Sequence, residues 1–108
     1  MKVLTSFKNG LLVLYFEGEL DHHESRDVAQ RLERILEEYL PRDCAMDLSG
    51  LRFMDSSGIA VILRVYRRMK EMGGRAWVEN PGTQPLRVLD ASGIDRVVKI
   101  NVSEGVRS

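Results

Sequence analysis

The sequence predicts an α/β domain built on one mixed β-sheet, with helices packed on the sheet. Two short apolar stretches at residues 3–7 and 11–16 are joined by Lys8-Asn9-Gly10, and an Asn-Gly turn predicts an antiparallel β-hairpin. Amphipathic helical patterns and short apolar segments then alternate along the chain, which is typical of parallel β-α-β crossovers. The 108 residues fit one domain, so we expect residues 1–108 to share one core.

The first helix is predicted from His22 to Leu40. Apolar residues recur there at helical spacing, charged residues fill the other positions, and Pro41 ends the helix. Asp21, followed by Glu24, suits a helix cap, and a recognition role for this loop is an equal alternative. The segment 43–48 is short and mostly apolar, which favours a buried strand, although its pattern also allows a helical piece.

A second helix is predicted from Ile59 to Met72, where Gly73-Gly74 ends it. Val61 and Val65 lie on a flank of its core-facing stripe, so the apolar arc is wider than one sheet contact requires. Two explanations stay open. A neighbouring helix covers this flank, or the flank is a surface for a partner.

The remaining elements follow in the same alternation. Residues 75–80 predict a strand, and Pro81-Gly82 predicts a turn. Pro85 suits the first turn of a short helix that ends at Gly93, and residues 97–102 predict a last strand.

Composition excludes several classes of protein. Sixteen basic and sixteen acidic side chains cancel, so the chain lacks the strongly basic character of nucleic-acid binders. Its apolar runs are of strand length, too short to span a bilayer, and the start lacks a signal peptide's apolar stretch, so we expect a cytoplasmic protein with no membrane partner. Cys44 is the only cysteine, which excludes an internal disulfide and a thiolate zinc cluster and predicts a small buried hydrophobe.

The most informative segment is 51–58, which contains Asp55-Ser56-Ser57-Gly58 and joins a strand to a helix. Aspartate, serine and glycine are typical of helix starts, so composition alone favours a structural cap. The alternative is a serine hydroxyl that accepts a phosphate, because a helix N-terminus stabilises negative charge.

A second loop, residues 18–24, also follows a strand, and such loops meet at one edge of a parallel sheet. We therefore expect the two loops to be neighbours. The acidic residues near the second loop would suit a basic partner surface; they are Glu17, Glu19, Asp21 and Glu24.

Enzyme motifs are missing from the sequence. It contains no G-x-S-x-G elbow and no glycine-rich nucleotide motif. His22 and His23 are adjacent, so on a helix they point about 100° apart and chelate a metal poorly. We therefore expect no catalytic residues, no cofactor and no metal, with a weak nucleotide-handling enzyme as the alternative of another class.

The segments 18–23 and 53–63 resemble the anti-sigma factor antagonists of the STAS domain family. Their Asp-His-His and Asp-Ser-Ser-Gly sequences favour the sporulation type over the general-stress type, and the similarity covers almost the whole chain. The resemblance implies a STAS-type fold and a protein that binds an anti-sigma factor serine kinase, similar to stage II sporulation protein AB, and so releases a sigma factor. It implies that the kinase phosphorylates Ser56 to switch binding off, and that a PP2C-type phosphatase restores binding.

The resemblance also assigns partner-binding residues. Asp21 and its neighbour His22 fall in the family's kinase-contact loop, and Asp55, Ser57 and Gly58 surround the phosphorylated serine. We add Val61 and Val65 from the apolar flank of the second helix. The family usually closes with another helix, whereas this sequence ends with residues 103–108, so we expect that helix to be shortened or absent. A general-stress or other sigma pathway is the alternative within the family.

Overall fold

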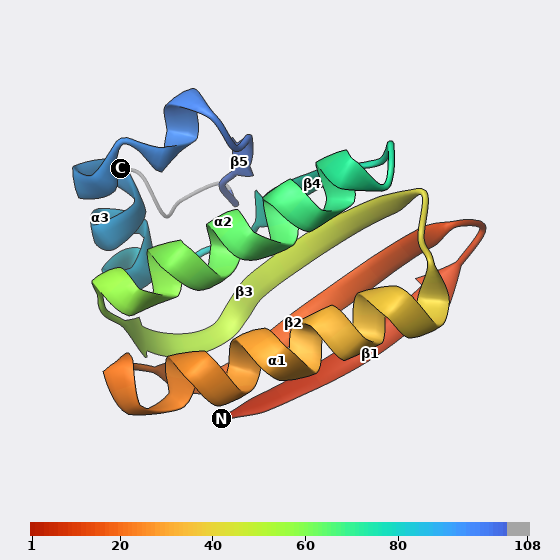
Figure 1. The fold of residues 1–108 in the computed structure, drawn as a ribbon. Helices are drawn as coiled ribbons and strands as arrows, with labels where there is room; N and C mark the ends of the chain where they lie inside the picture. Colours follow the sequence, from red (N-terminus) through yellow and green to blue (C-terminus); the bar gives the residue numbers. More distant parts are fainter. Residues whose placement is uncertain (104–108) are drawn as a thin grey trace.

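A computed structural model describes residues 1–103 and contains one five-stranded mixed sheet (Figure 1). Its elements are β1 Lys2–Lys8, β2 Leu11–Leu20, α1 His22–Tyr39, β3 Asp43–Met54, α2 Ser56–Glu71, β4 Arg75–Glu79, α3 Thr83–Ser92, the 3-10 turn η1 Ile94–Arg96 and β5 Ile100–Asn101. The strands lie in the order β1-β2-β3-β4-β5. The first pair is antiparallel and the other pairs are parallel, which confirms the predicted fold class.

The opening hairpin forms where Asn-Gly predicts it. Asn9 has a φ of 53° and Gly10 a φ of 81°, the left-handed conformations that a type I′ turn needs at both central positions. Lys8 pairs with Leu11 directly across the turn. The hairpin therefore sets the register of the first two strands.

Helices α1 and α2 lie side by side across one face of the sheet (Figure 1). The buried core between them and the sheet includes Leu12, Leu14, Phe16, Leu32, Leu36, Met46, Ile62 and Met69. Val61 and Val65 are only 2% and 3% exposed because α1 covers the flank of α2. The prediction that Val61 and Val65 border a partner surface is corrected accordingly: both are core residues, and the neighbouring helix is the right explanation.

Strands β2 and β3 are longer than their apolar stretches predict. β2 continues past residue 16 to Leu20, and β3 continues past residue 48 to Met54, paired with it in parallel. The register shifts twice along this pair, at Tyr15/Glu17 and Gly18/Glu19 on β2. Extra residues on β3 at these two shifts are β-bulges, and they let the pair continue through polar and glycine positions.

The last strand is shorter than predicted. Residues 97–102 were expected to form it, but only Ile100–Asn101 pair with β4. The N–H groups of Val97 and Val98 instead donate to the carbonyl of Ile94, at 2.9 and 2.8 Å. These two residues therefore close the 3-10 turn and do not pair with β4.

Helix α2 begins earlier than predicted, at Ser56 instead of residue 59, whereas α3 has Pro85 in its first turn and ends at Gly93 as predicted. The expectation of a shortened or absent closing helix falls on residues 104–108, outside the described residues.

Candidate functional site

The two loops singled out in the sequence lie together at the carboxyl ends of β2 and β3. The N–H of Asp55 donates to the carbonyl of Leu20 at 3.3 Å, and the N–H of His22 donates to Oδ2 of Asp55 at 3.0 Å. These bonds join residues 33 or more positions apart. The expectation that the loops are neighbours is therefore confirmed.

The side chain of Asp55 accepts hydrogen bonds from the first turns of two helices. While Oδ2 accepts from the first residue of α1, Oδ1 accepts from the N–H of Ser57 at 2.8 Å and so caps α2. Asp21 caps α1 in the same way, with Oδ1 accepting from the N–H of Glu24 at 3.0 Å. Both aspartates are half-buried. The structural-cap interpretation is correct for each of them, and it leaves the second carboxylate oxygen of Asp21 for another contact.

Gly58 allows the first turn of α2 to pack against the ends of the strands. The residue is buried, and a Cβ added there would lie 3.0 Å from Sδ of Met54 and 3.3 Å from Cδ2 of Leu20. A Cβ there would make unusually tight contacts, so the side chains of Met54 and Leu20 would have to shift. This close approach gives Gly58 a structural role at the site.

The neighbouring serines differ in exposure. Ser56 is the first residue of α2 and is exposed, whereas Ser57 is half-buried. Each serine lines a groove on its own side of α2. A groove of about 400 Å³ between α2 and α3 is lined by Ser56, Ile59, Arg87, Val88, Ala91 and Ser92. A groove of about 240 Å³ between α1 and α2 is lined by Ser25, Arg26, Ala29, Ser57, Ala60, Val61 and Arg64.

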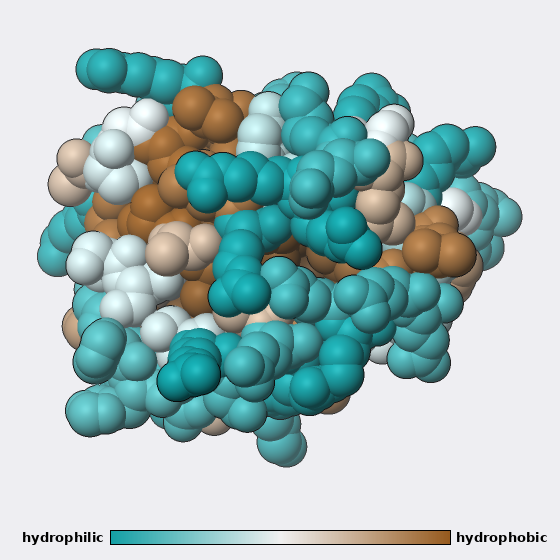
Figure 2. Space-filling view, in the orientation of Figure 1, coloured by the Kyte–Doolittle hydropathy of each residue, from teal (hydrophilic) through white to brown (hydrophobic). Residues whose placement is uncertain are grey.

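These grooves combine apolar floors with arginines. Figure 2 shows apolar surface gathered on the side of the molecule where α2 begins and α3 lies. Arg87 is exposed in the groove beside Ser56, and Arg26 and Arg64 are cations of the groove beside Ser57. The first turn of α2 thus presents the exposed Ser56 beside one partly apolar groove and the half-buried Ser57 beside another.

The predicted acidic cluster does not lie on one surface. Glu17 and Glu19 are exposed on β2 and alternate with the buried Phe16 and Leu20, so they face away from α1 and α2. Glu24 lies in the first turn of α1. Of the four residues, only Asp21 and Glu24 belong to the loop region beside Ser56.

Sequence reasoning missed Gln84, which ties α3 to the site. Its Oε1 accepts from the N–H of Met54 and its Nε2 donates to the carbonyl of Met54, both at 2.9 Å. The side-chain amide thereby mimics a paired strand at the residue before Asp55. Nothing in the local pattern around Gln84 indicates this contact, which spans 30 positions.

Residues 1–103 contain no group of three side chains suited to hold a metal ion. In the same part of the chain, no helix is long and apolar enough to cross a membrane. Cys44 is fully buried in the core, as predicted, and burial raises the pKa of its thiol to about 12.

A family model described as the STAS domain matches residues 2–107. The chain belongs to the STAS domain family. It is 34% identical to an anti-sigma F factor antagonist of Paenibacillus polymyxa, over 88% of this chain and 81% of that protein. It is 29% identical to an anti-sigma-B factor antagonist of Bacillus subtilis, over 82% of this chain and 80% of that protein.

The fold has close counterparts among solved structures. The anti-sigma factor antagonist SpoIIAA in its unphosphorylated form matches 95% of this STAS domain, and the match covers 90% of that chain, with a TM-score of 0.77 and 23% identity. The resemblance on which residues 18–23 and 53–63 were singled out is thus confirmed at the level of the family and its STAS fold.

Proposed function

We propose that this STAS domain is an anti-sigma factor antagonist of the sporulation type. In its unphosphorylated form it binds an anti-sigma factor serine kinase similar to stage II sporulation protein AB, and the kinase then releases its sigma factor. Phosphorylation of Ser56 ends this binding, and a PP2C-type phosphatase restores it. The observation that carries the proposal is the exposed hydroxyl of Ser56 at the start of α2, directly after Asp55, in a chain 34% identical to an anti-sigma F factor antagonist.

The choice of Ser56 over Ser57 rests on exposure and on direction. Ser56 is exposed, while Ser57 is half-buried beside the groove toward α1. Consecutive helical residues point about 100° apart, so a kinase site aligned with one hydroxyl misses the other. Phosphate transfer is therefore expected at Ser56.

Phosphorylation acts at the surface in this proposal. A phosphoserine adds about −1.5 to −2 charges at pH 7, and the N-terminus of α2 stabilises negative charge. Bonds from Asp55 and Gln84 anchor the backbone on which Ser56 is carried. The new dianion therefore changes the charge and bulk of the interface beside Asp55 and Asp21 instead of refolding the domain.

The direct experiment is phosphorylation followed by site mapping. The chain is incubated with candidate anti-sigma serine kinases and ATP, in parallel with Ser56→Ala and Ser57→Ala. The wild type and Ser57→Ala should carry phosphate, Ser56→Ala should carry none, and a PP2C-type phosphatase should remove it. Phosphate found mainly on Ser57 would overturn the assignment.

Binding measurements test the switch itself. Ser56→Ala should bind the kinase permanently, and Ser56→Asp should bind poorly, because every ~1.4 kcal/mol lost at the interface lowers affinity tenfold. Backbone NMR spectra of the two phosphorylation states should differ only near the start of α2. Unchanged affinity after complete phosphorylation would refute the switch.

Asp21 is proposed as a kinase contact through its charge. Asp21→Asn keeps a side chain that caps helices well and removes the charge, whereas Asp21→Ala removes both. Weaker binding by both variants, with lower stability only in Asp21→Ala, would support the contact. If Asp21→Asn bound the kinase with wild-type affinity, Asp21 would act only as a helix cap and not as a kinase contact.

A general-stress pathway is the second candidate, favoured by the 29% identity to an anti-sigma-B factor antagonist. Kinases of the two pathways, compared for affinity to this chain, separate the candidates. Either pathway places the protein in the cytoplasm, where sigma factors act. A weak nucleotide-handling enzyme would instead turn over nucleotide in the absence of any kinase and would lose that activity in Ser56→Ala.

A further inference from the structure

The edge of the sheet at β4 is open, away from the site described above. Within residues 1–103, β5 pairs only with the end of β4, at Val78 and Glu79, so the first three residues of β4 have no strand partner on that side. The N–H groups of Val78 and Asn80 donate to the carbonyls of Lys99 and Asn101, at 2.9 and 2.8 Å. Alternate residues of a strand point their polar groups the same way, so the N–H and C=O of Ala76 face this open edge.

A groove of about 470 Å³ runs along the open edge. Tyr66 and Lys70 of α2 form one wall, Trp77 forms another, and Val97 and Lys99 lie on the chain that leads to β5. Val97 is 56% exposed. The groove thus combines backbone groups of Ala76 that pair with no strand within residues 1–103 with aromatic and apolar contacts, as a site for an added strand requires.

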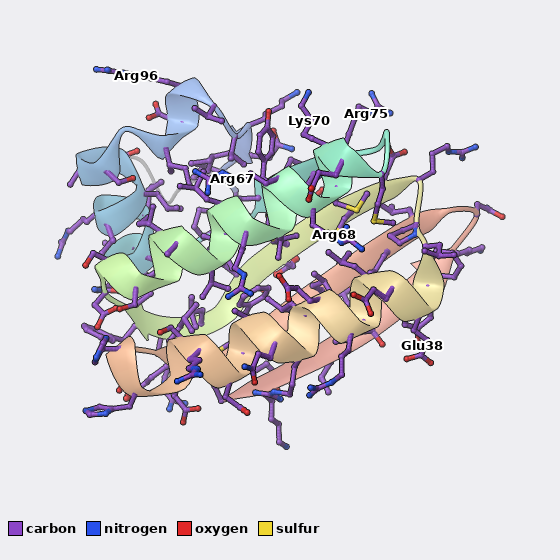
Figure 3. All side chains as sticks on the ribbon, in the orientation of Figure 1. Glu38, Arg67, Arg68, Lys70, Arg75 and Arg96 are labelled. Carbon is purple, nitrogen blue, oxygen red and sulfur yellow. The ribbon has the colours of Figure 1, made fainter. Side chains whose placement is uncertain are left out.

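The charge of the groove selects its occupant. Lys70, Arg75 and Lys99 line it, and its one carboxylate, Glu79, already accepts from Nε1 of Trp77 at 2.7 Å. Arg75 pairs with Asp43, but within residues 1–103 neither lysine pairs with a carboxylate. Figure 3 shows Lys70 and Arg75 extending outward on the same side of the molecule, from the end of α2 and the start of β4.

We propose that this edge groove binds an extended acidic segment of a partner protein, which adds to the sheet as a strand beside β4. A second copy of this chain is a poor occupant, because β1 at the other edge of the sheet carries Lys2 and Lys8 and would oppose cations with cations. The acidic segment places carboxylates near the two lysines and apolar side chains on Val97 and Tyr66. Hydrogen bonds to the backbone of Ala76 align the acidic segment with β4.

The test uses the full chain and a blocked peptide of alternating glutamate and valine. Trp77 is the only tryptophan, so its fluorescence reports on the groove, and the NMR shift of the Ala76 amide reports on strand pairing. We expect saturable binding that weakens as salt is added. A lysine-valine peptide, and the acidic peptide with N-methylated valines, should bind at least roughly tenfold more weakly, since one lacks the charge and the other lacks the N–H groups.

A charge-reversal pair completes the experiment. The double variant Lys70→Glu, Lys99→Glu should lose more than roughly tenfold in affinity, because two attractions become two repulsions. Lys2→Glu, Lys8→Glu on the far edge is the matched control and should change affinity by less than about twofold. Three results would each overturn the proposal: no binding of the acidic peptide, an Ala76 amide that does not shift at saturation, or equal binding of the N-methylated peptide.

Discussion

Replacing Asp55 by alanine should destabilise the domain more than replacing Asp21 does. The side chain of Asp55 accepts from Ser57 at 2.8 Å and from His22 at 3.0 Å, whereas within residues 1–103 the side chain of Asp21 accepts only from Glu24. A lost N-cap costs about 0.5–2 kcal/mol. The exposed bond to His22 adds about 0.5–1 kcal/mol, so Asp55→Ala should cost about 1–3 kcal/mol.

Thermal unfolding followed by circular dichroism measures this difference. In a domain of this size each kcal/mol lowers Tm by about 4–8 °C. Glu38→Ala is the control, because Glu38 is exposed on α1 and makes no contact with the site, and it should leave Tm nearly unchanged. Asp55→Ala and Asp21→Ala with the same Tm would refute the double-cap explanation.

Asp55→Asn separates the two bonds. An asparagine has one acceptor oxygen and one NH₂ donor, so it can satisfy Ser57 or His22 but not both. Amide hydrogen exchange should stay slow at Ser57 and become faster at His22, because the cap within α2 is the local contact. Unchanged exchange at both amides would mean that the carboxylate does not hold the two helices together.

Three further predictions concern contacts outside the aspartates. Gln84→Ala should lower the free energy of unfolding by about 1–3 kcal/mol, measured in urea, because both backbone groups of Met54 lose their partner. Gly74→Ala should be strongly destabilising, since an added Cβ would lie 2.7 Å from Cε of Met69 and even closer to a backbone oxygen. Gly82→Ala should cost less in the same assay, because its added Cβ meets nothing within 4 Å and only the glycine cap of α3 is lost. Burial raises the pKa of Cys44 from 9.0 to about 12, so the thiol's contribution to the free energy of unfolding is fully present below pH 9. Above pH 9 the free energy of unfolding should fall, by about 1 kcal/mol at pH 10, because the thiol ionises in the unfolded chain first. Cys44→Ala should lack this part of the fall.

Local chemistry made most of the fold predictable. The hairpin follows from Asn9-Gly10, because only a few residues tolerate positive φ at both turn positions. The two long helices follow from their apolar periodicity, and the start of α1 follows from Asp21 as its cap. The start of α2 lies three residues before the predicted one, because Asp55 caps the helix at Ser56. Each of these signals lies within a few residues of the feature that it predicts.

Strand lengths depend on partners that a local pattern does not contain. Gly50 is a typical loop residue, yet it pairs with Glu17 because a register shift brings the two strands back together. Val97 is a typical strand residue, yet the 3-10 turn at Ile94 keeps it out of the sheet. Pairing in the first case and a competing turn in the second override the propensity of the residue.

The candidate site was predictable in its residues but not in its connections. Asp55 and Ser56 stand out because of their types and their position before a helix. The bond from His22 to Asp55 and the pair of bonds from Gln84 to Met54 span 33 and 30 positions, and only the folded chain brings these groups together. The loop is therefore a junction of β2, β3 and the starts of three helices.

At this junction, residues that support the fold lie next to the exposed Ser56. Asp55 and Gly58 are held by hydrogen bonds or close packing, so substitutions at either one disturb the fold together with any interface. Ser56 lies between them, yet its side chain is exposed and makes no hydrogen bond within residues 1–103. In the proposed switch, a phosphate on Ser56 would meet a backbone that Asp55 and Gln84 already hold, so its charge would be presented to the partner and not absorbed by rearrangement of the loop. Under that proposal, a loss of kinase binding in a Ser56 variant would report on the interface alone, whereas the same loss in an Asp55 or Gly58 variant would report on the fold as well.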